Sequence, residues 1–189
     1  MRKILSILAM SAIVLGMASC GGNDGNEPEP EVIKAPSGYV DLGLPSKTLW
    51  YSNVTSYNFL SFPTYVEELD KQKKNAATKY VDIPTKEDWK ELHTYCTWEW
   101  MYPFTIQGIN NERAYIVKGK NGNSIILPAL GKRSTTGQKV SDGKGYYWMQ
   151  HTNHDIESAV QFGEESNSFQ FYGEADGWCL TVCLVFKQP

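Results

Sequence analysis

The chain has 189 residues, a formal net charge of −3 at pH 7 and 13% aromatic residues. A chain of this length suits one main domain. Its charge excludes nucleic-acid binding through a basic patch, because such proteins cluster Lys and Arg. Most of the aromatic rings are expected to fill the core, since rings bring a large area into protein interiors.

Residues 1–20 are organised as a bacterial lipoprotein signal peptide. Arg2 and Lys3 give a basic start, an apolar run covers 4–15, and small residues precede Cys20. The apolar run is too short for a spanning helix, which needs ~20 residues. The four residues that end at Cys20, Met-Ala-Ser-Cys, resemble the lipobox, which predicts acylation of Cys20 and a membrane anchor of several acyl chains. The alternative is an ordinary secretory signal with an incidental cysteine.

Residues 21–36 are dominated by Gly, Pro and acidic residues. This composition predicts a solvated tether. Acidic residues soon after Cys20 resemble the surface-export signal of Bacteroidetes lipoproteins, and Gly21 stands where Asp would suggest inner-membrane retention. We therefore expect a lipid-anchored protein on the outer membrane, exposed at the cell surface, with residues 37–189 as its folded domain.

The first half of the domain predicts two short strands, at 39–42 and 48–52, and two helices. The first helix is expected over 64–77, with Thr64 and Glu67 as a capping box. The second is expected over 85–96, where Thr85 can act as the N-cap. The second helix carries one stripe at helical spacing, composed of Trp89, Leu92, His93 and Cys96.

Three residues in this half are candidates for a site. His93 lies on the predicted buried stripe, so we expect a hydrogen-bonded core residue rather than a ligand. Trp98 and Trp100 alternate and share a face if the segment is extended. Such a pair can stack on a sugar, and more often it covers the core.

The second half is predicted to be mostly strands. Residues 114–131 contain two strand-like runs around Asn121-Gly122, which predicts a type I′ hairpin at the centre of the domain. Its second run does not alternate, which indicates a strand covered on both faces. A loop is expected over 132–144. Further strands are expected at 146–149, in a hairpin of 158–162 with 168–172, and over 178–186.

Four short motifs follow one another in a fixed order. They are Val-Asp-Leu-Gly-Leu-Pro-Ser at 40–46, Pro-Thr-Lys-Glu-Asp-Trp at 84–89, Gly-Asn-Ser-Ile-Ile-Leu-Pro-Ala at 122–129, and Gly-Tyr-Tyr-Trp at 145–148. In this order they resemble the Fibrobacter succinogenes major paralogous domain, which is common in surface lipoproteins of Bacteroidetes.

That family is thought to be related to the C-type lectin-like fold, shared distantly with formylglycine-generating enzymes. The resemblance implies an α+β domain with two helices packed on a small, twisted, mostly antiparallel sheet with long loops. The chain departs from the family pattern at Lys47, after Trp50, and at Met149-Gln150. The family supplies no established activity to transfer.

Three cysteines lie in the domain: Cys96, Cys179 and Cys183. Cys179 and Cys183 would lie ~13 Å apart in a regular strand, whereas a disulfide needs Cα atoms ~4.4–6.8 Å apart. The sequence leaves open a disulfide from Cys96 to one of them, or buried free thiols. The enzyme relatives hold copper between paired cysteines, and the strand geometry of Cys179 and Cys183 argues against a shared metal here.

One His and carboxylate cluster remains, formed by His151, His154 and Asp155. Two His spaced by three beside an acid could bind zinc, but no third His is near, so we expect no metal and no cofactor. The sequence shows no nucleophile elbow and no phosphate-binding loop.

We predict a non-catalytic binding module for a glycan or a protein. Its candidate contacts are Trp98, Trp100, His151, His154 and Asp155. The alternatives are a structural subunit of a surface assembly and, less favoured, a metal-dependent enzyme.

Overall fold

The computed structural model describes residues 33–52, 62–73, 78–106, 109–140, 143–150, 157–165, 168–174 and 177–188. The chain divides into two units, Met1–Val32 and Ile33–Pro189, and all described residues belong to the second. Cys20 therefore lies outside the described residues, as do the predicted contacts His151, His154 and Asp155.

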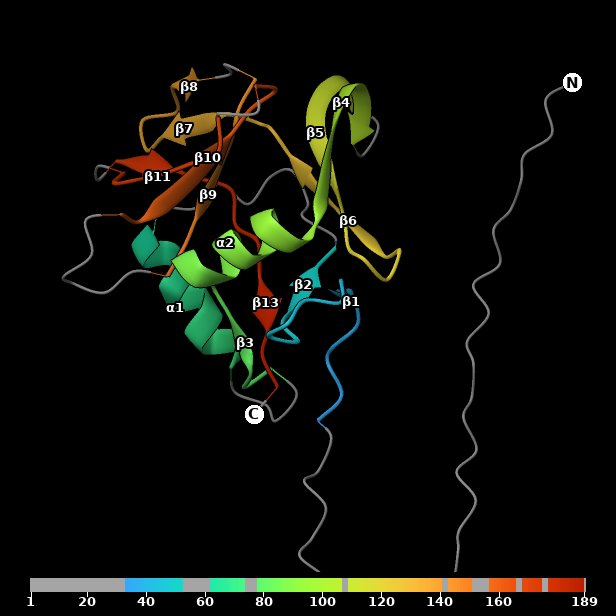
Figure 1. The fold of residues 1–189 in the computed structure, drawn as a ribbon. Helices are drawn as coiled ribbons and strands as arrows, with labels where there is room; N and C mark the ends of the chain where they lie inside the picture. The colour runs from blue at the N-terminus through green and yellow to red at the C-terminus, as the bar shows by residue number, and fades with distance from the viewer. Residues whose placement is uncertain are drawn as a thin grey trace, which may run out of the picture. The chain divides into compact units, whose positions relative to one another are not determined.

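The described residues form two helices and four small antiparallel sheets (Figure 1), which confirms the predicted mixed α+β class. The strand orders are β1-β2-β13-β3, β11-β10-β9, β12-β7-β8 and β4-β5-β6. The strands are β1 Tyr39–Asp41, β2 Leu49–Tyr51, β3 Val81–Asp82, β4 Thr97–Ile106, β5 Ile109–Lys118, β6 Ser124–Pro128, β7 Lys132–Ser134, β8 Lys139–Val140, β9 Gly145–Trp148, β10 Ala159–Phe162, β11 Gln170–Tyr172, β12 Trp178–Cys179 and β13 Val185–Phe186; the helices are α1 Phe62–Gln72 and α2 Lys86–Tyr95.

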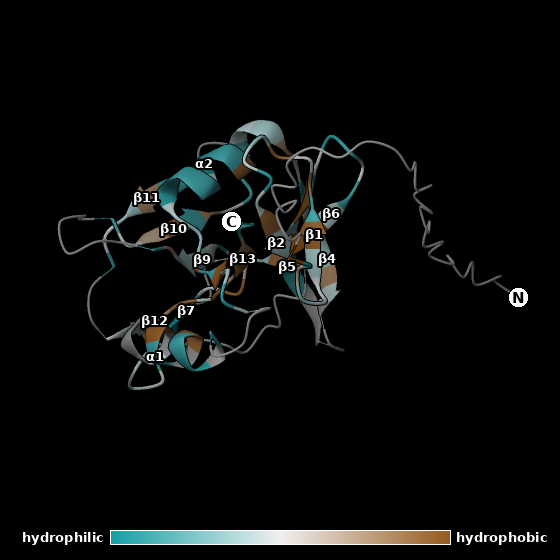
Figure 2. Cartoon of the chain, turned by 90° about the horizontal axis from the view of Figure 1, so that it is seen from below, coloured by the Kyte–Doolittle hydropathy of each residue, from teal (hydrophilic) through white to brown (hydrophobic). Residues whose placement is uncertain are grey.

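Helix α2 matches its prediction. Thr85 is the N-cap, its hydroxyl accepts from the backbone N–H of Asp88 at 3.2 Å, and Asp88 accepts from the backbone N–H of Thr85 at 2.7 Å. This capping box satisfies two N–H groups that the first turn leaves unpaired. Figure 2 shows α2 as largely hydrophilic, so its buried side is narrow and rests on Trp89 and Leu92.

The core forms where the inner side of α2 meets the strands. The Trp89 ring lies 4.9 Å from the Trp50 ring of β2 and 5.6 Å from the Tyr147 ring of β9, both measured between ring centroids. All three side chains are fully buried. Edge-on contacts between rings of this size add to the stabilisation that burial itself provides.

Helix α1 begins earlier than predicted. Pro63 lies in its first turn, where a missing N–H costs nothing. Thr64 is therefore inside the helix, and the predicted capping box with Glu67 is wrong. Glu67 instead pairs with Lys71 at 3.0 Å. Leu69 fixes the helix to the domain, since it is buried in a cluster with Val81, Ile83 and Phe186.

The β5–β6 hairpin forms as expected, with a different turn. Among the described non-glycine residues only Lys47 has a positive φ, so Asn121 cannot form the predicted type I′ turn. Gly122, with a φ of 87°, donates its N–H to Gly119 at 3.0 Å, as in a three-residue loop that ends on a left-handed glycine. The predicted cover on both faces is met in part, because Ile125 and Leu127 are buried on one face whereas Ile126 on the other is half-buried.

Two predictions for the C-terminal half are wrong in detail. Residues 132–144, expected as a loop, contain β7 and β8. The strand expected over 178–186 is divided into β12, which pairs with β7, and β13, which pairs with β2 and β3. Leu180 and Cys183, which lie between β12 and β13, are both buried and belong to different core clusters. Neither described helix has the length and apolar character needed to cross a bilayer.

Candidate functional site: an aromatic cavity

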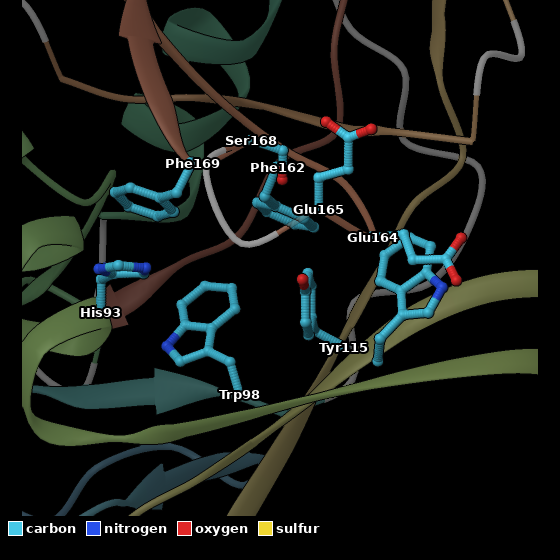
Figure 3. Close-up of a pocket in the computed structure, with 9 residues that line it drawn as sticks. His93, Trp98, Tyr115, Phe162, Glu164, Glu165, Ser168 and Phe169 are labelled. Carbon is cyan, nitrogen blue, oxygen red and sulfur yellow. The ribbon is translucent and has the colours of Figure 1, made fainter.

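A cavity of about 400 Å³ lies where α2, the β4–β5 hairpin and the turn between β10 and β11 meet. Figure 3 shows its rings side by side, with two carboxylates along one edge. We call it the aromatic cavity. Its lining consists of six aromatic residues, two acids and one serine: His93, Trp98, Trp100, Tyr115, Phe162, Phe169, Glu164, Glu165 and Ser168.

Strand β4 supplies two of these rings because side chains two residues apart point to the same face of a strand. Trp98 and Trp100 are both half-buried. The Trp98 indole donates to the Leu92 carbonyl at 3.3 Å, which ties this ring to the end of α2. The Trp100 ring lies 4.8 Å from the ring of Tyr115, its partner across the β4–β5 ladder. The Trp98 ring also lies 5.2 Å from the Tyr115 ring, so Tyr115 contacts both indoles.

The turn between β10 and β11 is fixed by hydrogen bonds around Gly163. Its carbonyl accepts from the Tyr115 hydroxyl at 2.6 Å and from the Ser168 hydroxyl at 2.8 Å. Ser168 also donates its N–H to the Glu165 carbonyl at 2.9 Å. These bonds place the exposed side chains of Glu164 and Glu165 at the rim of the aromatic cavity.

His93 does not take the buried position predicted for it. Its side chain is exposed and stacks on Phe169, with the ring centroids 4.1 Å apart. Partial burial against this ring lowers the pKa of His93 below its usual value. The imidazole is therefore mostly neutral at pH 7, because even an unperturbed histidine is less than half protonated above its pKa of ~6.5.

The charge of the aromatic cavity is consequently one-sided. Glu164 and Glu165 are acidic, and no Lys or Arg is among the lining residues. Burial raises the pKa of Tyr115, and the negative charge of Glu164 raises it further. Such a cavity repels anions, whereas neutral and cationic groups can enter it.

A second aromatic cluster, which we call the lysine cage, surrounds Lys132 of β7. The Lys132 ammonium lies 4.4 Å from the ring centroid of Trp178, 5.3 Å from that of Tyr146 and 5.8 Å from that of Tyr172. It also pairs with Glu174 at 2.6 Å, and the side chains of Lys132 and Glu174 are only 17% and 5% exposed. Glu174 accepts a further bond from the Tyr172 hydroxyl at 2.9 Å.

The three domain cysteines are free thiols in the structure, so the bridge from Cys96 to Cys179 or Cys183 is not formed. Burial raises the pKa of all three, that of Cys96 to about 11 and that of Cys183 to about 12. The thiol, not the reactive thiolate, is then the form at neutral pH. Within the described ranges, no three His, Cys, Asp or Glu side chains are grouped as a metal site.

Of the residues proposed from sequence, Trp98 and Trp100 lie in the aromatic cavity. The sequence reasoning missed Tyr115, Phe162 and Phe169 as lining residues, and also the two acids of the β10–β11 turn. Tyr115 lies on the predicted hairpin, but which ring it faces depends on strand register and not on any local pattern. Compared with known proteins, the chain matches no family model, no curated protein and no solved structure.

Proposed function

We propose that this protein is a non-catalytic binding module of a surface lipoprotein, and that it binds a glycan or protein ligand in the aromatic cavity. The observation that carries the proposal is the cavity itself, where six aromatic residues surround a volume of about 400 Å³. Ligand sites in proteins are typically concave and apolar, about 300–1,000 Å³ in volume, with a few polar groups that orient the ligand.

The cellular location and the fold family are part of the same proposal. Acylation of Cys20 would hold the domain on the outer membrane, and residues 21–36 would act as the tether that displays it. The ordered motifs support membership of the Fibrobacter succinogenes major paralogous domain family and a C-type lectin-like fold. The mixed α+β class with two helices agrees with that fold and does not by itself identify it.

The rings offer two kinds of contact. The face of an indole can stack against the apolar face of a sugar ring, and its quadrupole attracts a positive charge. Glu164 and Glu165 can accept hydrogen bonds from hydroxyl or amine groups at the rim. Both glycans and proteins can present these groups.

The test is a ligand titration followed by tryptophan fluorescence on the full chain in detergent, with neutral oligosaccharides and short peptides. The variants are Trp98→Ala and Trp100→Ala. Tyr102→Ala is the matched control, because Tyr102 is also a ring on β4 but is 55% exposed and does not line the cavity. We expect both tryptophan variants to lose binding and the control to keep it. Ligands that bind all three variants equally would refute this site.

A further inference from the structure

We propose that the aromatic cavity takes the side chain of a lysine from a peptide or protein ligand, with the ammonium held between the rings and Glu164 and Glu165. This inference rests on the proposed binding function and specifies its ligand. Three observations carry it: the charge of the cavity, the lysine cage in the same domain, and a buried donor on Trp100.

The charge of the lining favours a cation. Glu164 and Glu165 are at the rim, and no Lys or Arg lines the cavity. His93 is mostly neutral at pH 7, because burial lowers its pKa. Lys144 lies beside Gly163 of the turn and does not line the cavity. A cation entering the cavity would therefore meet ring faces and negative charge together, the two features that stabilise an ammonium in an aromatic site.

The lysine cage is an example of this chemistry in the same domain. Tyr146, Tyr172 and Trp178 surround the Lys132 ammonium while Glu174 pairs with it. The aromatic cavity offers the same classes of group, indole and phenol rings together with carboxylates. The arrangement of the cavity also suits a lysine side chain. Its aliphatic part can lie along the rings while the charged end stays at the polar rim.

Trp100 points to a peptide as the source of the lysine. Its indole N–H is buried and has no hydrogen-bond partner among the described residues. A buried donor without an acceptor is costly, and a ligand that supplies an acceptor removes that cost. A peptide brings backbone carbonyls on either side of its lysine, whereas a free amine brings none.

The experiment uses three peptides on the full chain in detergent, measured by calorimetry at pH 7.5. The probes are Ac-Gly-Lys-Gly-amide, the same peptide with an Nε-acetylated lysine, and the same peptide with norleucine. We expect the lysine peptide to bind at least about tenfold more tightly than either neutral peptide, because both analogues remove the charge. Its affinity should also fall with added salt.

The double variant Glu164→Gln/Glu165→Gln should weaken the lysine peptide about tenfold and leave the neutral peptides unchanged. Glu99→Gln is the matched control, since Glu99 is an exposed acid of β4 between Trp98 and Trp100 and does not line the cavity. Trp100→Phe, which keeps a ring and removes the N–H, should weaken the lysine peptide as well.

Three results would overturn the inference. Equal binding of the lysine and norleucine peptides would show an apolar site without cation selectivity. No peptide binding together with retained binding of a neutral oligosaccharide, lost in Trp98→Ala, would refute the lysine ligand and leave the binding module intact. If neither peptides nor oligosaccharides bind, both the lysine ligand and the proposed binding function fail.

Discussion

The lysine cage and the aromatic cavity combine the same groups with different burial. In the cage, Glu174 is 5% exposed and has a lysine of its own chain beside it. At the cavity, Glu164 and Glu165 are exposed on a turn. A buried carboxylate needs a built-in counter-ion, because desolvation of a lone charge costs several kcal/mol. An exposed carboxylate is solvated by water, so it can stay charged without a counter-ion and remain available to a ligand. The cage is thus expected to govern stability, and the cavity binding.

The largest expected effect comes from breaking the cage. Lys132→Met keeps most of the aliphatic volume and removes the ammonium that pairs with the buried Glu174, which we expect to cost about 3 kcal/mol of unfolding free energy. Urea denaturation would measure it. Lys90→Met is the control, because the Lys90–Glu87 pair is exposed and such pairs contribute roughly 0–1 kcal/mol. Equal losses in the two variants would contradict a stabilising role for the cage.

A second variant of the cage separates charge from packing. Adding Glu174→Gln to Lys132→Met also removes the buried negative charge, so the double variant should recover part of the lost stability. Ligand binding at the aromatic cavity should be unchanged in either variant once the protein is folded, because neither residue lines it. A loss of binding in folded protein would show that the two clusters are coupled.

The next effect in size comes from Gly145 at the start of β9, the strand that connects the two clusters. A Cβ added here would lie 2.3 Å from a ring carbon of Phe162, which is fully buried and lines the cavity. Gly145→Ala should therefore destabilise the protein by about 1–3 kcal/mol through overpacking and weaken ligand binding too. Both are measured by urea denaturation and by titration of the purified variant.

Gly163→Ala is the comparison for Gly145→Ala. A Cβ at Gly163 would lie 3.2 Å from the flexible Lys144 side chain and 3.6 Å from that of Ser168, an ordinary contact distance, so a smaller loss of stability is expected. If the two alanine variants lose the same stability, contact with Phe162 is not the cause.

The sequence predicts the elements that local chemistry decides. Helix α2 could be placed because Thr85, the acids of the first turn and the Trp89 spacing all lie within one segment. The turn type at Asn121 could not be predicted, because hydrogen bonds to a distant segment decide it. The side chains of Asn121 and Asn123 both donate to the Asp41 carbonyl, at 2.9 and 2.8 Å. The Asn-Gly dipeptide alone does not reveal the Asp41 carbonyl, which lies 80 positions before Asn121 in the chain.

The candidate site was predictable only on its β4 side. The alternation of Trp98 and Trp100 gives them a common face whatever they pack against. The rest of the cavity depends on which segments meet. Phe169 reaches His93 from a turn 76 positions later in the chain, and the two stacked rings lie beside the buried core and not within it. A stripe at helical spacing shows which residues can share a side, not how far that side is covered.

The smallest expected effect is a pH dependence of stability that comes from the aromatic cavity, through His93, and not from the lysine cage. Burial lowers the pKa of His93, so the folded protein keeps this imidazole neutral while the unfolded chain takes up a proton near pH ~6.5. Stability should therefore fall as the pH drops below about 6.5, since the unfolded state binds more protons there, and the contribution should be constant at higher pH. Urea midpoints between pH 5 and 8 would measure this slope.

His93→Gln should reduce that slope, and the comparison with the unchanged protein isolates His93 because His151 and His154 are present in both. The double variant Lys132→Met/Glu174→Gln should keep the slope, since it removes the buried carboxylate, which could itself titrate in this range once Lys132 is gone, and the lysine cage contains no histidine. Lysine-peptide binding should weaken over the same acidic range, because a protonated His93 places a positive charge in the cavity wall. A slope that survives His93→Gln unchanged would mean that the ring stacked on Phe169 titrates as it would in water, and that the cavity wall does not discriminate against its charged form.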